Sequence, residues 1–128
     1  MEDEDEIGTI IIGESIEVHK NLGPGLLEST YQRCLEYELR ERGIDFETQV
    51  SLPVVYKNAH LNFGYRIDLV VEDLVIVEIK AVEKSQPIYK AQLLTYLRLF
   101  GCRLGYVINF NEVLLKDGIC RLVNNKSW

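Results

Sequence analysis

The chain has 128 residues, of which 47% are hydrophobic, so it suits one compact domain and has little room for a second core. Its formal charge of −6 is concentrated in five consecutive acidic residues at positions 2–6, and from Ile7 onward 15 acidic residues stand against 14 basic ones. A nearly neutral body argues against tight non-specific binding to DNA, because such binding depends on many phosphate contacts from Lys and Arg. We expect a disordered acidic leader over residues 1–6 and a single domain over 7–128.

Cysteines and histidines give no sign of a disulfide framework or a zinc site. The chain has an odd number of cysteines at wide spacings, and its two histidines lie far apart without a ligand-spaced partner. The start is acidic where a secretory signal is basic, and no apolar run approaches the roughly 18 residues of a membrane span. These features predict a cytoplasmic protein without membrane association.

Apolar residues at helical spacing predict three helices. The first runs over 7–22 and is ended by Gly23-Pro24-Gly25, and the second runs from about 26 to 42, where Gly43 ends it. Pro87 suits the first turn of a third helix that reaches about residue 100 and closes at Gly101.

Alternating or apolar runs predict six strands, over residues 50–56, 61–71, 74–80, 104–109, 112–115 and 119–123. Pro53 lacks a backbone donor, which suggests an edge position or a bulge in the first of these strands. The order is therefore α-α-β-β-β-α-β-β-β. It predicts an α/β (α+β) fold in which helices flank a mixed sheet.

Charged residues of the second and third strands fall on one face: Arg66, Asp68, Glu78 and Lys80. If the connection between the strands has three residues, 72–74, then Val71 lies opposite Val75 and Asp68 faces Glu78. Arg66 then faces Lys80. A two-residue connection would mix the charges with aliphatic side chains, so we prefer the longer one.

Two interpretations of this ionic face remain open. It is either a solvated sheet face or a cation site. Facing carboxylates are unfavourable by a few tenths to about 1 kcal/mol, and a divalent cation between Asp68 and Glu78 removes the conflict. Two carboxylates beside an ammonium are the groups needed to hold Mg²⁺ and to position a water.

Two further polar groups also allow two interpretations. Glu28 opens the second helix, where an acidic residue is favoured by the helix dipole alone. Gln92 and Tyr96 share one face of the otherwise apolar third helix, where ordinary interior hydrogen bonds would satisfy them.

Considered together, these groups resemble the GxxExxY family, which Gly25, Glu28 and Tyr31 spell out, within the PD-(D/E)XK nuclease-like superfamily. The resemblance extends from Ile7 to about Arg121 and includes the motifs Gly23-Pro24-Gly25, Arg66-x-Asp68, Glu78-Ile79-Lys80, Gln92-x-x-x-Tyr96 and Asn109-Phe110. It implies a restriction-endonuclease-like core, with a mixed sheet between helices.

The resemblance also implies an active site. Its metal ligands for Mg²⁺ or Mn²⁺ would be the carboxylates of Asp68 and Glu78, the backbone carbonyl of Ile79, and Glu28 as the helical acidic residue beside the metal. Lys80 would orient the attacking water. Gln92 and Tyr96 match an element of RecB-like nucleases and complete the expected catalytic set.

The expected function is Mg²⁺-dependent hydrolysis of DNA phosphodiester bonds by a metal-activated water. Expected phosphate contacts come from Arg66, Lys84 and Lys90, with Arg98 and Arg103 as further candidates. The alternative is a non-catalytic protein-interaction or regulatory module that keeps the nuclease fold. A second copy of the chain or another protein is a further expected partner.

Overall fold

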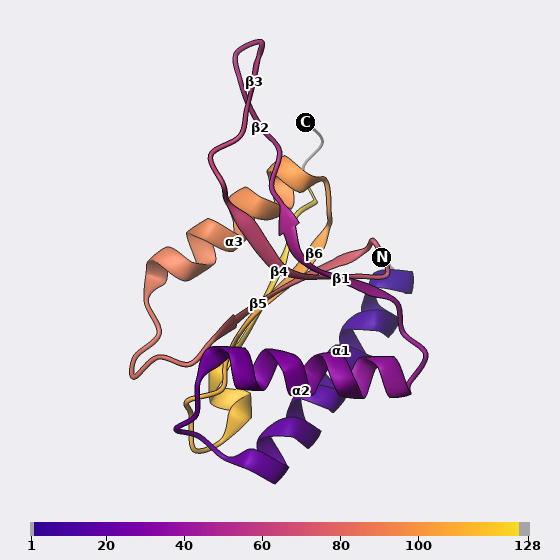
Figure 1. The fold of residues 1–128 in the computed structure, drawn as a ribbon, viewed down its shortest axis with the longest axis vertical. Helices are drawn as coiled ribbons and strands as arrows, with labels where there is room; N and C mark the ends of the chain where they lie inside the picture. Colours follow the sequence, from indigo (N-terminus) through magenta and orange to yellow (C-terminus); the bar gives the residue numbers. More distant parts are fainter. Residues whose placement is uncertain (1, 126–128) are drawn as a thin grey trace.

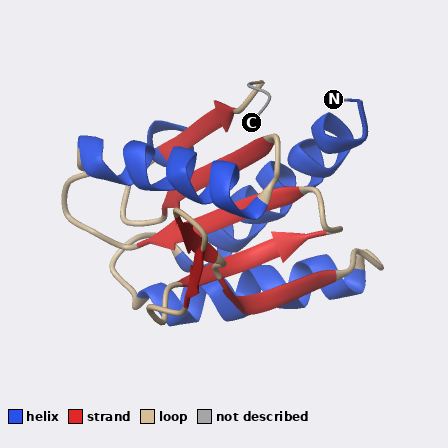
Figure 2. Ribbon diagram, turned by 90° about the horizontal axis from the view of Figure 1, so that it is seen from above, coloured by secondary structure: helices blue, strands red, loops and turns tan. Residues whose placement is uncertain are grey.

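A computed structural model describes residues 2–125, in which a five-stranded sheet lies between helices (Figures 1 and 2). The helices are α1 (Glu2–Leu22), α2 (Glu28–Glu41) and α3 (Pro87–Phe100), with a short 3₁₀ helix η1 (Leu115–Gly118). The strands are β1 (Phe46–Ser51), β2 (Val54–Tyr56), β3 (Ala59–Leu61), β4 (Arg66–Val71), β5 (Val75–Lys80), β6 (Leu104–Asn109) and β7 (Ile119–Val123).

The main sheet has the strand order β1-β4-β5-β6-β7. β5 and β6 are parallel because α3 carries the chain across the sheet between them, and the other neighbours are antiparallel. The predicted mixed sheet flanked by helices is therefore confirmed. β2 and β3 form a separate two-stranded hairpin that projects from the sheet (Figure 1).

Two apolar clusters bury the two faces of the sheet. α1 and α2 cover one face with side chains such as Ile11, Leu35 and Leu39, all fully buried. α3 covers the other face with Leu93 and Leu97. Helices on both faces explain why β5 and β6 are apolar with hardly a break, rather than alternating.

Several predicted boundaries were wrong. The predicted strand 50–56 is divided between β1 and β2, and 61–71 between β3 and β4. Pro53 cannot donate to a ladder, and Gly64 has a positive φ of 79°, so the chain leaves the sheet at both points and forms the hairpin. No strand forms over 112–115, where the chain turns into η1.

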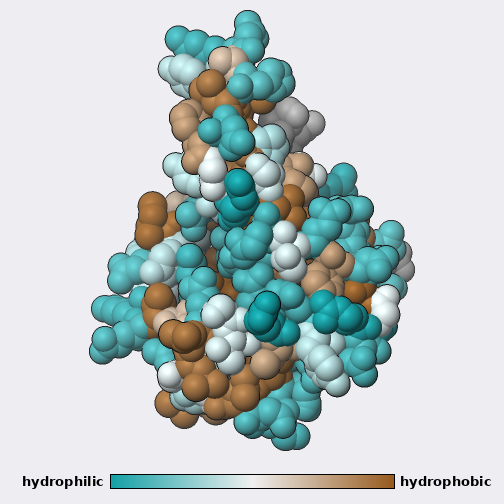
Figure 3. All heavy atoms as spheres, in the orientation of Figure 1, coloured by the Kyte–Doolittle hydropathy of each residue, from teal (hydrophilic) through white to brown (hydrophobic). Residues whose placement is uncertain are grey.

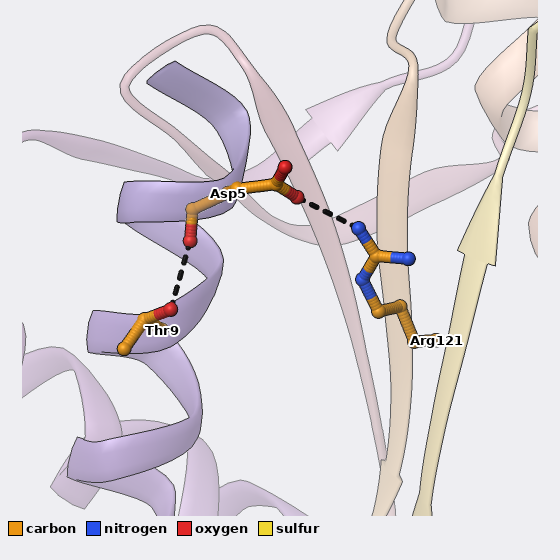
Figure 4. A network of polar contacts seen from close by, with 3 residues as sticks. All are labelled: Asp5, Thr9 and Arg121. Atoms are coloured by element: carbon orange, nitrogen blue, oxygen red, sulfur yellow. Dashed lines mark hydrogen bonds and ion pairs between the residues drawn. The ribbon is translucent and has the colours of Figure 1, made fainter. Parts of the chain in front are cut away.

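The predicted disordered leader also differs from the structure, since α1 begins at Glu2. Acidic residues suit the positive end of a helix. Figure 4 shows how the next turn is held: the Arg121 guanidinium on β7 donates to the Asp5 carboxylate at 2.7 Å, and Thr9 donates to the Asp5 carbonyl at 2.9 Å. Residue 1 lies outside the described residues. Among the residues described, no helix is both long and apolar enough to cross a membrane.

The close approach of α3 to the sheet gives a stability prediction. A Cβ at Gly105 on β6 would lie 2.9 Å from the Leu93 Cδ1 and 3.0 Å from the Leu97 Cδ2. We expect Gly105→Ala to lower the free energy of unfolding by roughly 1 to 3 kcal/mol through overpacking. The control is Gly13→Ala at an exposed position of α1, where a Cβ meets nothing within 4 Å, and its free energy of unfolding should rise by up to about 1 kcal/mol. Urea unfolding of both variants measures this, and equal changes would contradict the packing described.

Candidate functional site

The β4–β5 connection sets the register of the site. Val71 pairs with Val75, as predicted for a three-residue connection over 72–74. Glu72 and Asp73 both adopt positive φ, 54° and 56°, and the Leu74 N–H donates to the Val71 carbonyl at 2.9 Å to close the turn. This register, continued along the strands, places Asp68 opposite Glu78.

At Asp68 the regular backbone ladder between β4 and β5 ends, and backbone N–H groups donate hydrogen bonds to side-chain carboxylates instead. The Asp68 backbone N–H donates to the Glu78 Oε2 at 2.8 Å, and the Ile79 N–H donates to the Asp68 Oδ2 at 2.9 Å. Gln32 on α2 donates to the Asp68 carbonyl at 3.2 Å. Each carboxylate therefore satisfies a backbone donor of the opposite strand, and the two carboxylates converge between β4 and β5.

Glu78 is nearly buried, with 5% of its surface exposed. Burial, followed by the negative charge of Asp68, raises the pKa of Glu78 from its ordinary value of 4.5 to about 8. The Asp68 N–H and the Lys80 ammonium oppose this shift but do not cancel it. Without a cation, Glu78 therefore holds a proton at neutral pH, and this proton relieves the repulsion between the facing carboxylates.

Glu28 lies at the start of α2, within electrostatic reach of the pair. Burial first, and then the charge of Asp68, raise the pKa of Glu28, while Lys80 lowers it. The loop before α2 fixes this position, because the Tyr31 hydroxyl donates to the Gly23 carbonyl at 2.6 Å and accepts from the Leu26 N–H at 3.1 Å. The Tyr31 ring stacks on Phe110, with ring centroids 4.7 Å apart. Tyr31 thus holds the helix that carries Glu28.

Lys80 ends β5 on the same side as Glu78. Its Nζ lies 4.7 Å from the centroid of the Tyr89 ring at the start of α3, which restrains the ammonium group by a cation–π contact. Its charge favours ionisation of both Glu28 and Glu78. Three elements, α2, β4 and β5, therefore bring three acidic groups and one basic group together.

Asn109 and Gln32 have roles that the sequence analysis did not assign. The buried Asn109 side chain accepts from the Val82 N–H at 3.0 Å and donates to the Val82 carbonyl at 3.0 Å, which fixes the chain just after Lys80. A polar residue that ends an otherwise apolar strand is the sequence signal for Asn109. Gln32 follows Glu28 by one helical turn, and this spacing is its signal.

Tyr96 on α3 interacts with the carboxylate pair. Burial first, and then the charge of Glu78, raise the pKa of Tyr96. Gln92 lines a pocket between α3 and the stem of the hairpin together with Tyr96. Hydrogen bonds and electrostatic interactions thus connect five of the predicted catalytic residues, Glu28, Asp68, Glu78, Lys80 and Tyr96, and Gln92 is placed beside Tyr96 only. Their catalytic roles stay a prediction.

The predicted pairing of Arg66 with Lys80 stays a prediction, because the regular β4–β5 ladder extends only to Leu69 and Val77. On its other edge, β4 pairs Arg66 with Ser51 on β1. The guanidinium of Arg66 is exposed and donates to the Tyr65 carbonyl at 3.1 Å. The other predicted phosphate contacts, Lys84 and Lys90, are also exposed, on the loop before α3 and on α3 itself.

The donor set fits a hard divalent cation. No group of three or more His, Cys, Asp or Glu side chains in residues 2–125 is arranged to hold a metal ion. Mg²⁺ needs fewer, since it takes oxygen ligands and is commonly held by one or two carboxylates together with waters and substrate phosphates. Asp68, Glu78 and the Ile79 carbonyl supply such oxygens, and a cation would stabilise the ionised form of the buried Glu78.

The chain belongs to the PD-(D/E)XK nuclease superfamily, whose family model matches residues 5–122. Membership fits the mixed sheet between helices and suggests a nuclease as the class of activity, and nucleases of this superfamily generally use divalent metals. The narrower GxxExxY assignment stays a prediction. No curated protein and no solved structure was found to match the chain.

The raised pKa of Glu78 makes stability depend on pH. Between about 4.5 and about 8 the folded state binds the Glu78 proton more tightly than the unfolded state. The stability that this proton adds is fully present at pH values below the Glu78 pKa of the unfolded state. It is lost as pH rises toward and through the Glu78 pKa of the folded state, at up to about 1.4 kcal/mol per pH unit. Glu78→Gln keeps the hydrogen-bond acceptor but has no ionisable group. Its free energy of unfolding should therefore rise relative to that of the wild type as pH rises. Urea unfolding in EDTA at about pH 5 and about pH 8 measures the difference, and a pH-independent difference would contradict a shifted Glu78.

Proposed function

We propose that the protein is a cytoplasmic nuclease that uses Mg²⁺ or Mn²⁺ to hydrolyse DNA phosphodiester bonds. The observation that carries the proposal is the exchange of carboxylates between β4 and β5. Each carboxylate uses one oxygen for the opposite backbone, and we assign the second oxygens of Asp68 and Glu78, with the Ile79 carbonyl, to the cation. Three free thiols in the described residues accord with a reducing compartment.

When bound by Asp68, Glu78 and the Ile79 carbonyl, a divalent cation would supply charge stabilisation at the phosphate and would lower the pKa of a water. The residues of the chain then have separate tasks. Lys80, held over Tyr89, orients the attacking water and favours ionisation of the neighbouring carboxylates. Glu28 adds negative charge on the α2 side of the cation, and Gln92 and Tyr96 bind the substrate from α3. Ionised Glu78 is the form that binds the cation, so cleavage should require displacement of its proton.

The proposed contacts to DNA depend on a small number of basic side chains. Arg66, Lys84 and Lys90 are exposed around the site and can contact phosphates. The chain beyond Glu6 has almost equal numbers of acidic and basic residues. Affinity for duplex DNA should therefore be modest and should fall with salt only gently, because few phosphate counterions are released.

Lys80→Ala separates chemistry from folding. The side chain is half-buried and its described aromatic contact is one cation–π pair, so stability should stay within about 1 kcal/mol of the wild type. Loss of a group that positions the nucleophile should lower cleavage by at least about a hundredfold. The measurement is cleavage of linear, nicked and branched DNA in Mg²⁺ or Mn²⁺.

The matched control is Lys20→Ala, which removes the same side chain from the exposed last turn of α1 and should leave cleavage unchanged. Retained cleavage by purified, folded Lys80→Ala protein would contradict the role of Lys80. Absence of cleavage by the wild type on every substrate with either metal would overturn the proposal and favour the non-catalytic module.

A further inference from the structure

The hairpin formed by β2 and β3 stands beside α3 (Figure 1), and its stem encloses a pocket of about 540 Å³ with that helix. The stem contributes Leu52, Phe63 and Tyr65, and α3 contributes Ile88, Gln92 and Tyr96. This volume falls within the roughly 300 to 1,000 Å³ of small-molecule sites. We call it the aromatic pocket.

Large apolar side chains at the pocket are exposed to water. Phe63 exposes 61% of its surface, Tyr65 51% and Ile88 65%. Single exposed apolar residues are common, but a contiguous group around a hollow marks a binding site. Figure 3 shows apolar residues between polar ones along the projecting hairpin.

The backbone that carries the two rings is anchored at the stem of the hairpin. The Tyr65 carbonyl accepts from the Leu52 N–H at 3.1 Å and from the Arg66 guanidinium at 3.1 Å. Between the two rings, Gly64 has a positive φ of 79°, and its N–H donates to the Asn62 Oδ1 at 3.0 Å. The Phe63 and Tyr65 rings meet edge to face, with centroids 6.5 Å apart. The pocket therefore presents two neighbouring aromatic rings on an anchored backbone.

The aromatic pocket adjoins the proposed catalytic site through Tyr96. Tyr96 lines the pocket beside Gln92, and it interacts electrostatically with Glu78 and Asp68 as well as with Tyr65. Arg66, whose guanidinium is bound to the Tyr65 carbonyl, offers a cation at the rim. A ligand in the pocket would place its next covalent unit near the carboxylates.

Building on the proposed nuclease function, we infer that the aromatic pocket receives an unpaired nucleobase of the strand being cleaved, so that the substrate is single-stranded or locally unpaired DNA. Nucleobases stack on aromatic rings whatever their sequence, and stacking supplies affinity that does not depend on many cations. This chain has few surplus cations and an aromatic pocket beside its carboxylates. A base within a duplex is already stacked and can enter only by flipping out, which costs energy.

The binding test uses a fluorescently labelled single-stranded oligonucleotide and its duplex, measured by anisotropy in EDTA so that no hydrolysis is needed. The wild type should bind the single strand at least about tenfold more tightly than the duplex. Phe63→Leu keeps an apolar side chain but loses the aromatic face, and should lower single-strand affinity about tenfold with duplex affinity unchanged. Phe63→Trp should restore it.

The high exposure of Phe63 means that these variants should fold, and Tyr65→Leu provides a second probe whose backbone anchors remain. The control is Val113→Ala, which alters an 84% exposed apolar residue on the loop after β6 and should change neither affinity. Equal binding of single strand and duplex, or a preference that survives both Phe63→Leu and Tyr65→Leu, would overturn the inference.

Cleavage in Mn²⁺ distinguishes this inference from the proposed function. If the protein prefers single strands through Phe63 but does not cleave them, the base-binding pocket would be supported and the nuclease function would be contradicted. If both DNA forms are cleaved with equal efficiency and Phe63→Leu has no effect, the nuclease function would be supported and the base-binding role of the pocket would be contradicted. Single-strand cleavage that falls with Phe63→Leu and returns with Phe63→Trp would support both.

Discussion

The reciprocal hydrogen bonds of Asp68 and Glu78 are the interaction on which the site depends. Backbone donors inside a sheet must find acceptors, and here each of two carboxylates serves a donor on the strand that carries the other. The arrangement brings two acidic groups together at a buried position where both cannot be ionised at low cost. The proton on Glu78 balances the charge of this site, and in the proposed function a cation would take its place.

Some residues around this pair fix the backbone of the site, and others present their charged groups next to the carboxylates. Tyr31, stacked on Phe110 and bonded to the Gly23 carbonyl, fixes the start of α2 and so the place of Glu28. Asn109 fixes the chain that follows Lys80. Several motif residues therefore act as positioning residues, which hold the helix and the chain that carry Glu28 and Lys80.

The register of β4 and β5 could be predicted from the sequence, because local alternation of side chains determines it. Alternation in β4 and β5 indicated the three-residue connection, and the pairing of Val71 with Val75 confirms it. The predicted strands 50–56 and 61–71 contain the residues of the hairpin, but its separation from the main sheet at Pro53 and Gly64 was not predicted, because local patterns do not show which sheet a strand joins. The first turn of α1 was missed since its bond to Arg121 joins residues 116 positions apart. Periodicity also cannot show where a ladder ends, and the regular β4–β5 ladder stops at Leu69 and Val77, short of Arg66 and Lys80.

The account makes the carboxylate pair a cation site, and X-ray diffraction from crystals soaked in Mn²⁺ tests this most directly. The account predicts one anomalous scattering peak roughly 2.0 to 2.3 Å from a carboxylate oxygen of both Asp68 and Glu78. A structure at saturating Mn²⁺ in which the two carboxylates keep their backbone bonds and no peak lies between them would contradict it.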